Sequence, residues 1–226
     1  MSKLDGPRLP PARGGPAKQL VILAHGYGSN GQDLIGLAPY LARALPDAVF
    51  VSPNAPDPAP GAAGGYQWFP ISRLDPRLMA EGVRGAAATL DGFIDAELRR
   101  HDLPASACAL VGFSQGTMMS LHVGLRRPQP LGAILGLSGM LADAGPVASR
   151  PPVALVHGSH DEVIPVTALF ASLEGLAAAG VPALWRVSHG TGHSVAEDGL
   201  ALGAEFLRDA LAGRFAGWGA SERRPS

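Results

Sequence analysis

Apolar residues follow two alternating patterns along the chain. Short unbroken apolar runs, typical of strands buried on both faces of a sheet, alternate with longer segments in which apolar residues recur every three or four positions, as on one face of a helix. Strands are expected at 19–24, 48–51, 107–111, 131–138, 152–156 and 183–187. Helices are expected at 34–45, 79–98, 118–125, 166–179 and 195–211. The alternation predicts an α/β fold with a mostly parallel, doubly wound sheet and helices on both faces.

The expected elements fill residues 19–212 without a linker, so we predict a single domain over that range. A domain of about this size buries roughly 70% of the surface of its unfolded chain, which allows a large core. Residues 1–18 are rich in Pro, Gly and Arg and show neither period, so they are expected to form a flexible N-terminal arm. Residues 213–226 are expected to form a flexible C-terminal tail.

Composition and charge narrow the functional classes. Hydrophobic residues make up 46% of the chain and charged residues 16%, which suits a sheet that is covered on both faces. The formal net charge of −1 and the lack of a dense basic patch argue against nucleic acid as a partner. The single cysteine, Cys108, falls in an expected buried strand, which indicates a reducing compartment. The sequence shows neither the apolar segment of a signal peptide nor an apolar run long enough to span a bilayer, so we expect a cytoplasmic protein without stable membrane insertion.

The strand expected at 107–111 runs directly into Gly112-Phe113-Ser114-Gln115-Gly116, which has the form Gly-x-Ser-x-Gly. Between a strand and a helix, these two glycines permit a sharp turn that holds the serine hydroxyl clear of the sheet edge. The chain has 30 glycines, so the motif by itself carries little weight and its surroundings must decide.

Two further polar residues follow later strands in the same way. Asp161 comes after the strand at 152–156, and His193 comes after the strand at 183–187. Because the carboxyl ends of parallel strands share one edge of a sheet, we expect Ser114, Asp161 and His193 to meet there. A serine nucleophile needs an imidazole to accept its proton, and the imidazole needs an acid to orient it. The chain order Ser, Asp, His is the order found in α/β-hydrolases.

Other residues compete for two of these roles. Glu162 and Asp143 are rivals for the acid, but Asp161 follows its strand directly. His189 is a rival for the base, but His193 immediately precedes the final helix, where a loop can hold it over the serine. Three further histidines are expected to serve hydrogen bonds in turns: His25, His157 and His160.

An acyl-transfer enzyme also needs N–H donors for the oxyanion that forms during the reaction. The N–H of Gln115, directly after the serine, is one expected donor. The N–H of Tyr27, in the glycine-containing turn after the strand at 19–24, is the other. Gly26 in the same turn lets the backbone approach the substrate closely.

The turn with Gly26, Gly28 and Gly31 also matches the dinucleotide-binding fingerprint, so a dinucleotide-binding oxidoreductase is an alternative. That function calls for an acidic residue at the end of the next strand, and the strand at 48–51 ends without one. A lactonase that uses the same triad is a further alternative.

Residues 55–71 form a proline-rich segment that ends in large aromatic side chains, including Trp68 and Phe69. The aromatic pair either anchors the loop to the core or forms an apolar wall for a ligand. We predict that Trp68, Phe69, Met140 and Val163 shape an apolar acyl site that favours short to medium chains.

Taken together, the motifs resemble the phospholipase/carboxylesterase and acyl-protein thioesterase family of α/β-hydrolases. The matching segments are His25-Gly26-Tyr27-Gly28, Trp68-Phe69, the serine motif at 112–116, the segment 157–165 and Gly192-His193. The resemblance covers residues 16–211 and implies a short esterase or thioesterase with a Ser-Asp-His triad, no large lid, no metal and no organic cofactor. Pro70 and Tyr27 depart from the pattern of many acyl-protein thioesterases, which places the chain nearer to the bacterial carboxylesterase branch and leaves the substrate open.

We therefore predict a serine hydrolase that cleaves carboxylic esters through an acyl-enzyme. Thioesters and lysophospholipids remain open as further substrates. The expected partner is a small-molecule ester or thioester, and a homodimer is left open.

Overall fold

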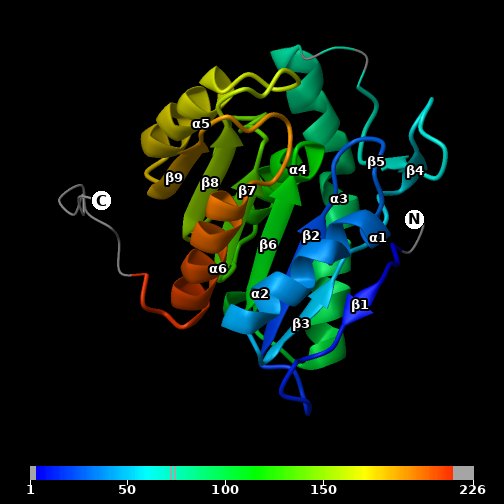
Figure 1. Ribbon diagram of the computed structural model, residues 1–226, viewed down its shortest axis with the longest axis vertical. Helices are drawn as coiled ribbons and strands as arrows, with labels where there is room; N and C mark the ends of the chain where they lie inside the picture. Colours follow the sequence, from blue (N-terminus) through cyan, green and yellow to red (C-terminus); the bar gives the residue numbers. More distant parts are fainter. Residues whose placement is uncertain (1–3, 72, 74, 216–226) are drawn as a thin grey trace.

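The computed structural model describes residues 4–71, 73 and 75–215, and its centre is a seven-stranded sheet with the order β1-β3-β2-β6-β7-β8-β9 (Figure 1). The strands β2 to β9 of this sheet run parallel, whereas β1 pairs antiparallel with β3 at one edge. The strands are β1 (Arg8–Leu9), β2 (Gln19–Ala24), β3 (Ala48–Val51), β6 (Cys108–Phe113), β7 (Ala133–Leu137), β8 (Val153–Gly158) and β9 (Ala183–Ser188). Within the proline-rich segment, β4 (Asp57–Pro58) and β5 (Tyr66–Gln67) form a separate short hairpin.

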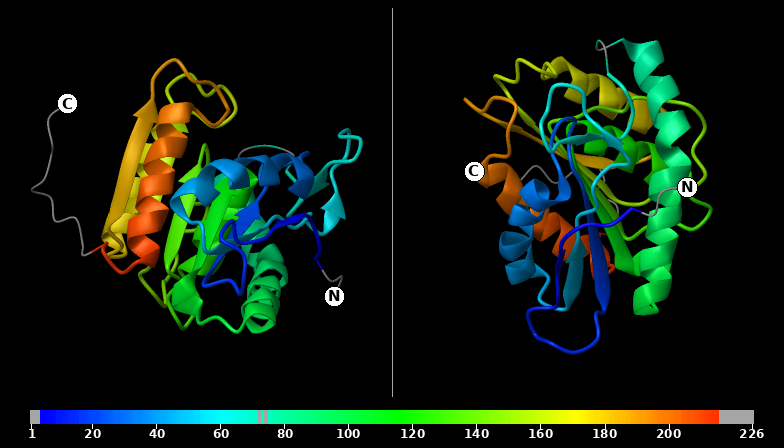
Figure 2. Two further views of the ribbon diagram at one scale, coloured as in Figure 1. Left: turned by 60° about the horizontal axis from the view of Figure 1, so that its bottom comes forward. Right: turned by 90° about the vertical axis from the view of Figure 1, so that its right-hand side faces the viewer.

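Helices cover both faces of the sheet, as Figures 1 and 2 show. They are α1 (Gly31–Leu34), α2 (Ala38–Ala44), α3 (Pro76–His101), α4 (Gln115–Gly124), α5 (Thr167–Ala178) and α6 (Glu197–Leu211). Successive residues of a strand point to opposite faces, so Leu20 and Ile22 pack in the cluster with α3 and α4, while Val21 and Leu23 pack in the cluster with α2 and α6. The predicted α/β-hydrolase architecture is thereby confirmed, and no large lid domain is present in the described part of the chain.

The helix expected at 34–45 is interrupted. The structure has α1, then a 3₁₀ turn at Ile35–Leu37, and then α2. Pro39 lies in the first turn of α2, where its missing N–H costs nothing, but it could not continue a helix from the preceding turn. The prediction of one continuous helix over 34–45 is therefore wrong, although most of that range is helical.

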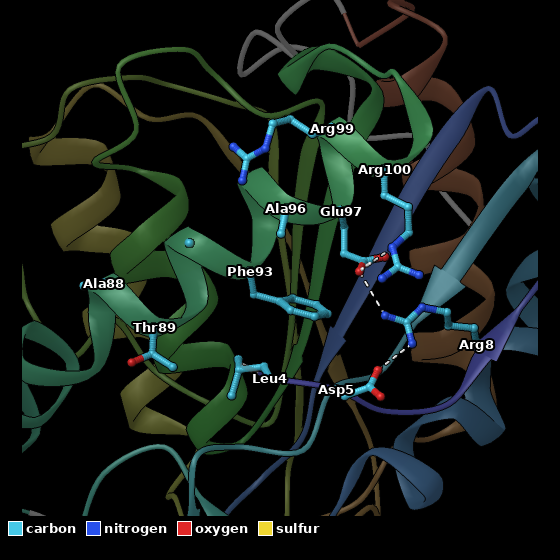
Figure 3. A pocket seen from close by; sticks show the side chains of 11 residues that line it. Leu4, Asp5, Arg8, Ala88, Thr89, Phe93, Ala96, Glu97, Arg99 and Arg100 are labelled. Carbon is cyan, nitrogen blue, oxygen red and sulfur yellow. Dashed lines mark hydrogen bonds and ion pairs between the residues drawn. The ribbon is translucent and has the colours of Figure 1, made fainter. Parts of the chain in front are cut away.

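The segment before β2 differs from the flexible arm expected for residues 1–18. Arg8 and Leu9 pair with β3 as an edge strand, and Leu4 is buried in the core. Arg8 Nη2 lies 2.9 Å from Oε1 of Glu97 on α3, a carboxylate that is 2% exposed (Figure 3). A pocket of about 770 Å³ lies beside this ion pair, between the segment and α3 (Figure 3). An ion pair that joins residues 89 positions apart has no local sequence signal. Residues 216–226 of the expected tail lie outside the described residues.

A cluster of charged side chains connects the segment after β7 with α3 and with the end of α4. The carboxylate of Asp143 accepts hydrogen bonds from Arg84 Nε at 2.9 Å and Arg84 Nη2 at 3.0 Å, and Arg126 Nη2 lies 3.2 Å away. The hydrogen bonds from Arg84 lower the pKa of Asp143 to about 2. His122 Nδ1 lies 3.5 Å from the same carboxylate, yet burial, reinforced by Arg126, lowers the pKa of His122 to about 4. His122 is therefore neutral at pH 7, and its contact with Asp143 is not an ion pair.

Because His122 is buried and neutral, we expect the folded state to lose stability in mild acid. As pH falls from 6.5 towards 4, the unfolded chain binds a proton at His122 that the folded chain does not bind, so the folded state is destabilised by up to about 3 kcal/mol. In His122→Gln, the decrease in the free energy of unfolding between pH 6.5 and 4 should be smaller by up to that amount, measured by urea denaturation at each pH. His189→Gln, at an exposed position, is the matched control and should keep the wild-type slope. Equal slopes in His122→Gln and the wild type would contradict the prediction.

Candidate active site

Ser114 occupies the sharp turn between β6 and α4. Its backbone has φ 53° and ψ −115°, a left-handed conformation that is strained for a residue with a side chain. A Cβ on Gly112 would lie 2.4 Å from Gly116 O, and a Cβ on Gly116 would lie 1.8 Å from Ala24 O. Both glycines of the motif are therefore required by close backbone packing. Ser114 is held at the sheet edge by its N–H, which donates to Leu137 O at 2.9 Å.

Asp161 and His193 lie together at the ends of β8 and β9. His193 Nδ1 is 2.8 Å from Asp161 Oδ2, and the other carboxylate oxygen, Oδ1, accepts from the N–H groups of Val163 at 3.0 Å and Ile164 at 2.8 Å. The Asp161 side chain is fully buried and that of His193 is 19% exposed. A hydrogen bond from Nδ1–H to the carboxylate fixes the tautomer of His193 and leaves its Nε2 free to accept a proton.

The loops that carry these two residues are bound to each other. His160 N–H donates to Thr191 O at 2.9 Å, and Ser159 N–H donates to Ser188 O at 3.0 Å. Gly158 permits this approach, because a Cβ there would lie 2.4 Å from the carbonyl oxygens of Thr191 and Gly192. These backbone contacts hold the two loops against each other and so support the short bond between His193 and Asp161.

His193 also lies beside the serine turn. Its ring centroid is 5.0 Å from that of Phe113, the residue before Ser114. Ser138, just after β7, donates through Oγ to Ser194 O at 3.2 Å and so links the histidine loop to the end of β7. The hydrogen bonds within the described residues do not include one between Ser114 Oγ and His193.

The turn after β2 lies against the serine. A Cβ on Gly26 would be 3.2 Å from both Ser114 Cβ and Phe113 Cδ1. His25 shapes this turn, because its Nδ1 donates to Gly26 O at 2.7 Å and its Nε2 accepts from Ala55 N at 2.9 Å. Burial lowers the pKa of His25, which favours the neutral ring that this pair of hydrogen bonds requires. As Figure 1 shows, β2 and β6 are neighbours in the sheet, at the point where the strand order reverses, which is the usual ligand site of open α/β sheets.

Two backbone N–H groups, one in each of these turns, are the donors that the sequence predicts for an oxyanion. Gln115 is the first residue of α4, so its N–H has no acceptor in the helix. Neither this N–H nor that of Tyr27 donates to an acceptor within the described part of the chain.

The same turn is poorly suited to a dinucleotide phosphate. Gly28 N–H donates to Tyr66 O at 2.9 Å, and Gly31 N–H donates to Asn54 Oδ1 at 2.8 Å. The helix that follows, α1, has only four residues. The glycines serve backbone packing here: a Cβ on Gly31 would lie 2.0 Å from Ser52 O.

Trp68 and Phe69 are 2% and 3% exposed and belong to the core cluster. Trp68 Nε1 donates to His25 O at 3.0 Å, and the ring of Phe69 fills the space above Gly82 of α3. These contacts anchor the proline-rich loop, as one of the two interpretations of the aromatic pair predicts. Of the other expected acyl-site residues, Met140 is half-buried and Val163 is 53% exposed.

The side chain of Gln115 has a role that the sequence did not indicate. Its Oε1 accepts from Trp68 N at 2.9 Å and its Nε2 donates to Phe69 O at 2.7 Å. The residue after the serine therefore connects the aromatic loop to the serine turn. The motif itself contains no signal for this contact, because the partner is a backbone segment 46 and 47 residues away.

The rival candidates lie elsewhere. Glu162 and His189 are exposed, and Asp143 is bound by Arg84 and Arg126 in the charged cluster described above. The structure thus brings Asp161 and His193 together, at the edge that carries Ser114, and separates the alternatives from them.

A family model described as Phospholipase/Carboxylesterase matches residues 11–211. The chain belongs to the phospholipase/carboxylesterase family. This confirms the resemblance inferred from the motifs, and it makes the chain a serine hydrolase that acts on esters. Among the helices of the described residues, none combines the length and apolarity needed to cross a membrane.

Relatives within the family carry consistent names. Esterase YpfH of Escherichia coli (strain K12) is 28% identical over 194 residues, which cover 85% of this chain and 83% of that protein. Acyl-protein thioesterase 1 of Kluyveromyces lactis is 32% identical over 167 residues, which cover 67% of this chain and 73% of that protein. The crystal structure of esterase PE8 superposes with a TM-score of 0.88 at 42% identity and covers 92% of this chain and 100% of that one.

Proposed function

We propose that this phospholipase/carboxylesterase family member hydrolyses small carboxylic esters through an acyl-enzyme formed on Ser114. The observation that carries the proposal is the 2.8 Å bond between His193 Nδ1 and Asp161 Oδ2, at the sheet edge where Ser114 has a strained backbone. That bond leaves His193 Nε2 to act as the base, and Asp161 orients the imidazole and stabilises its charged form.

The reaction has two halves. In the first, Ser114 Oγ attacks the ester carbonyl carbon while His193 Nε2 takes the hydroxyl proton. The N–H groups of Tyr27 and Gln115 stabilise the oxyanion, and the tetrahedral intermediate then expels the alcohol, which receives the proton from His193. In the second half, His193 deprotonates a water molecule that attacks the acyl-enzyme, and the carboxylic acid leaves as Ser114 recovers its proton. A thioester can follow the same steps with a thiol as the leaving group.

The acyl group of the substrate is expected to contact the apolar residues that remain accessible near the triad. Val163 lies two residues after Asp161 and is 53% exposed, and Met140 lies just beyond β7 and is half-buried. Trp68 and Phe69 are almost fully buried, and they support this site because Met140 packs against the core cluster to which they belong. A small open apolar surface of this kind favours short to medium acyl chains.

The test is a hydrolysis panel of p-nitrophenyl esters from acetyl to octanoyl, with a thioester, a lysophospholipid and a lactone as further substrates. We expect kcat/KM to rise with acyl length over the short chains by roughly fourfold per buried CH₂, because each contributes about 0.8 kcal/mol. In Val163→Asp this rise should be flattened, while the rate on the acetyl ester changes little.

Thr167→Asp, at an exposed position on the same segment, is the matched control and should keep the wild-type profile. Identical profiles in Val163→Asp and the wild type would remove Val163 from the acyl site. A wild-type enzyme that hydrolyses the lactone alone would overturn the proposed substrate class.

A further inference from the structure

A second histidine lies against the acid of the triad. His157, the fifth residue of β8, has a side chain that is 1% exposed, and its Nε2 lies 3.3 Å from Asp161 Oδ2. This is the same carboxylate oxygen that His193 contacts at 2.8 Å. Asp161 therefore faces two imidazoles, whereas the triad mechanism uses only one.

The hydrogen bonds of His157 fix its protonation. Nε2 lies 2.8 Å from Ile164 O, and because a carbonyl oxygen can only accept, Nε2 carries the hydrogen. Nδ1 is buried and has no hydrogen-bond partner among the described residues. A proton on Nδ1 would be a buried donor without an acceptor, which is costly, so the ring is held as the neutral Nε2–H tautomer.

This N–H acts on both ends of the turn that holds the acid. By bonding Ile164 O, it closes the turn whose N–H groups, from Val163 and Ile164, bind Asp161 Oδ1. The same N–H also lies close to Asp161 Oδ2, the oxygen that accepts the hydrogen bond from His193 Nδ1. The positive end of the N–H dipole of His157 therefore faces this oxygen. The neighbouring ionisable residues in the turn, His160 and Glu162, are exposed, so His157 and His193 are the buried or half-buried imidazoles that face this carboxylate.

We propose that His157 is a positioning residue that holds the Asp161 carboxylate and adjusts its interaction with His193 through the Nε2–H group. The proposal rests on the proposed function, because it assigns His157 a role through the same triad. Two consequences follow for catalysis. Without the N–H, the carboxylate loses part of its fixed orientation, so the chemical step slows while substrate binding is unaffected. In addition, removal of the His157 N–H takes away the positive end of a dipole near Asp161. The positively charged form of His193 is then less strongly opposed and becomes more favourable.

The experiment compares His157→Gln with His157→Met. The two side chains have the same length, but only glutamine can place an N–H near the position of Nε2. For His157→Met we expect a decrease in kcat of about 10-fold or more with KM within about twofold of the wild type, and the acid limb of the kcat/KM profile should move to higher pH by roughly 0.5. His157→Gln should remain within about threefold of the wild type in kcat and keep its pH profile.

Several controls separate this role from a merely structural one. His160→Asn changes an exposed histidine of the same turn and should leave kcat and the pH profile unchanged. Thermal melting checks that each variant is folded; if His157→Met is not, His157→Leu replaces it, because leucine also carries no N–H donor. Equal kcat values and equal pH profiles for the glutamine variant and the donor-free variant would overturn the proposal.

Failure of the proposed function and failure of the proposed role of His157 would give different results. If Ser114→Ala keeps esterase activity, the triad itself is wrong. If Ser114→Ala is inactive and the donor-free His157 variant matches His157→Gln, the triad stands and the role of His157 fails.

Discussion

Replacement of Ser114 by alanine is expected to lower kcat for a short p-nitrophenyl ester by roughly 10⁵-fold, because loss of the nucleophile leaves only substrate binding and oxyanion stabilisation. The fold should be retained: Ser114 makes no side-chain cap to α4, and its backbone N–H can still bond Leu137 O. Alanine is less suited than glycine to the positive φ, but it is no worse than serine there. Steady-state kinetics and the melting temperature are the measurements.

Covalent labelling provides an independent readout of the same prediction. A fluorophosphonate should modify the wild type once, at Ser114, and should leave Ser114→Ala unmodified when the peptides are analysed by mass spectrometry. Ser106→Ala is the matched control, since this exposed serine lies just before β6, at the opposite end of the strand from Ser114. Labelling at another residue, or wild-type turnover in Ser114→Ala, would contradict the mechanism.

Asp161→Asn should lower kcat by roughly 10⁴-fold through the wrong tautomer of His193. Oδ1 of residue 161 accepts two N–H groups, from Val163 and Ile164, so an asparagine must place its oxygen there. Its NH₂ group then occupies the position of Oδ2 and donates to His193 Nδ1. The histidine hydrogen moves to Nε2, and this nitrogen can no longer accept the proton of Ser114. The measurement is kcat across pH 6 to 9, with substrate at saturation.

The rival acids supply the controls for Asp161→Asn. Glu162→Gln changes the exposed neighbour and should leave kcat unchanged. Asp143→Asn should lower the free energy of unfolding at pH 7 by about 2 kcal/mol at most, because the low pKa of this carboxyl stabilises the fold above pH 4 and that contribution is lost towards pH 2. Its kcat at pH 7 should remain near that of the wild type. A decrease in kcat in either control that matches the decrease in Asp161→Asn would mean that the acid has been assigned wrongly.

The sequence patterns predicted the sheet better than its surroundings. All six strands expected from apolar runs are present in the sheet, with ends that differ by up to two residues, because unbroken β-branched runs are a strong signal of buried strands. The helix at 34–45 and the N-terminal arm were less well predicted. The first was interrupted near Pro39, and the second gained its order from the pairing of Arg8 with Val51 and from the ion pair with Glu97. Both contacts of Arg8 are long-range, and local patterns cannot report them.

For the candidate site, the sequence by itself determined which residues to expect: a serine in a Gly-x-Ser-x-Gly turn, with an acid and a histidine after later strands, in the order of α/β-hydrolases. Only the tertiary structure decided which acid and histidine meet, how Gln115 fastens the aromatic loop, and that His157 lies beside Asp161. The physical reason is that strand periodicity and turn residues are local properties of the chain. Hydrogen bonds between the ends of neighbouring strands depend on sheet order and register, which arise only when the whole core is packed.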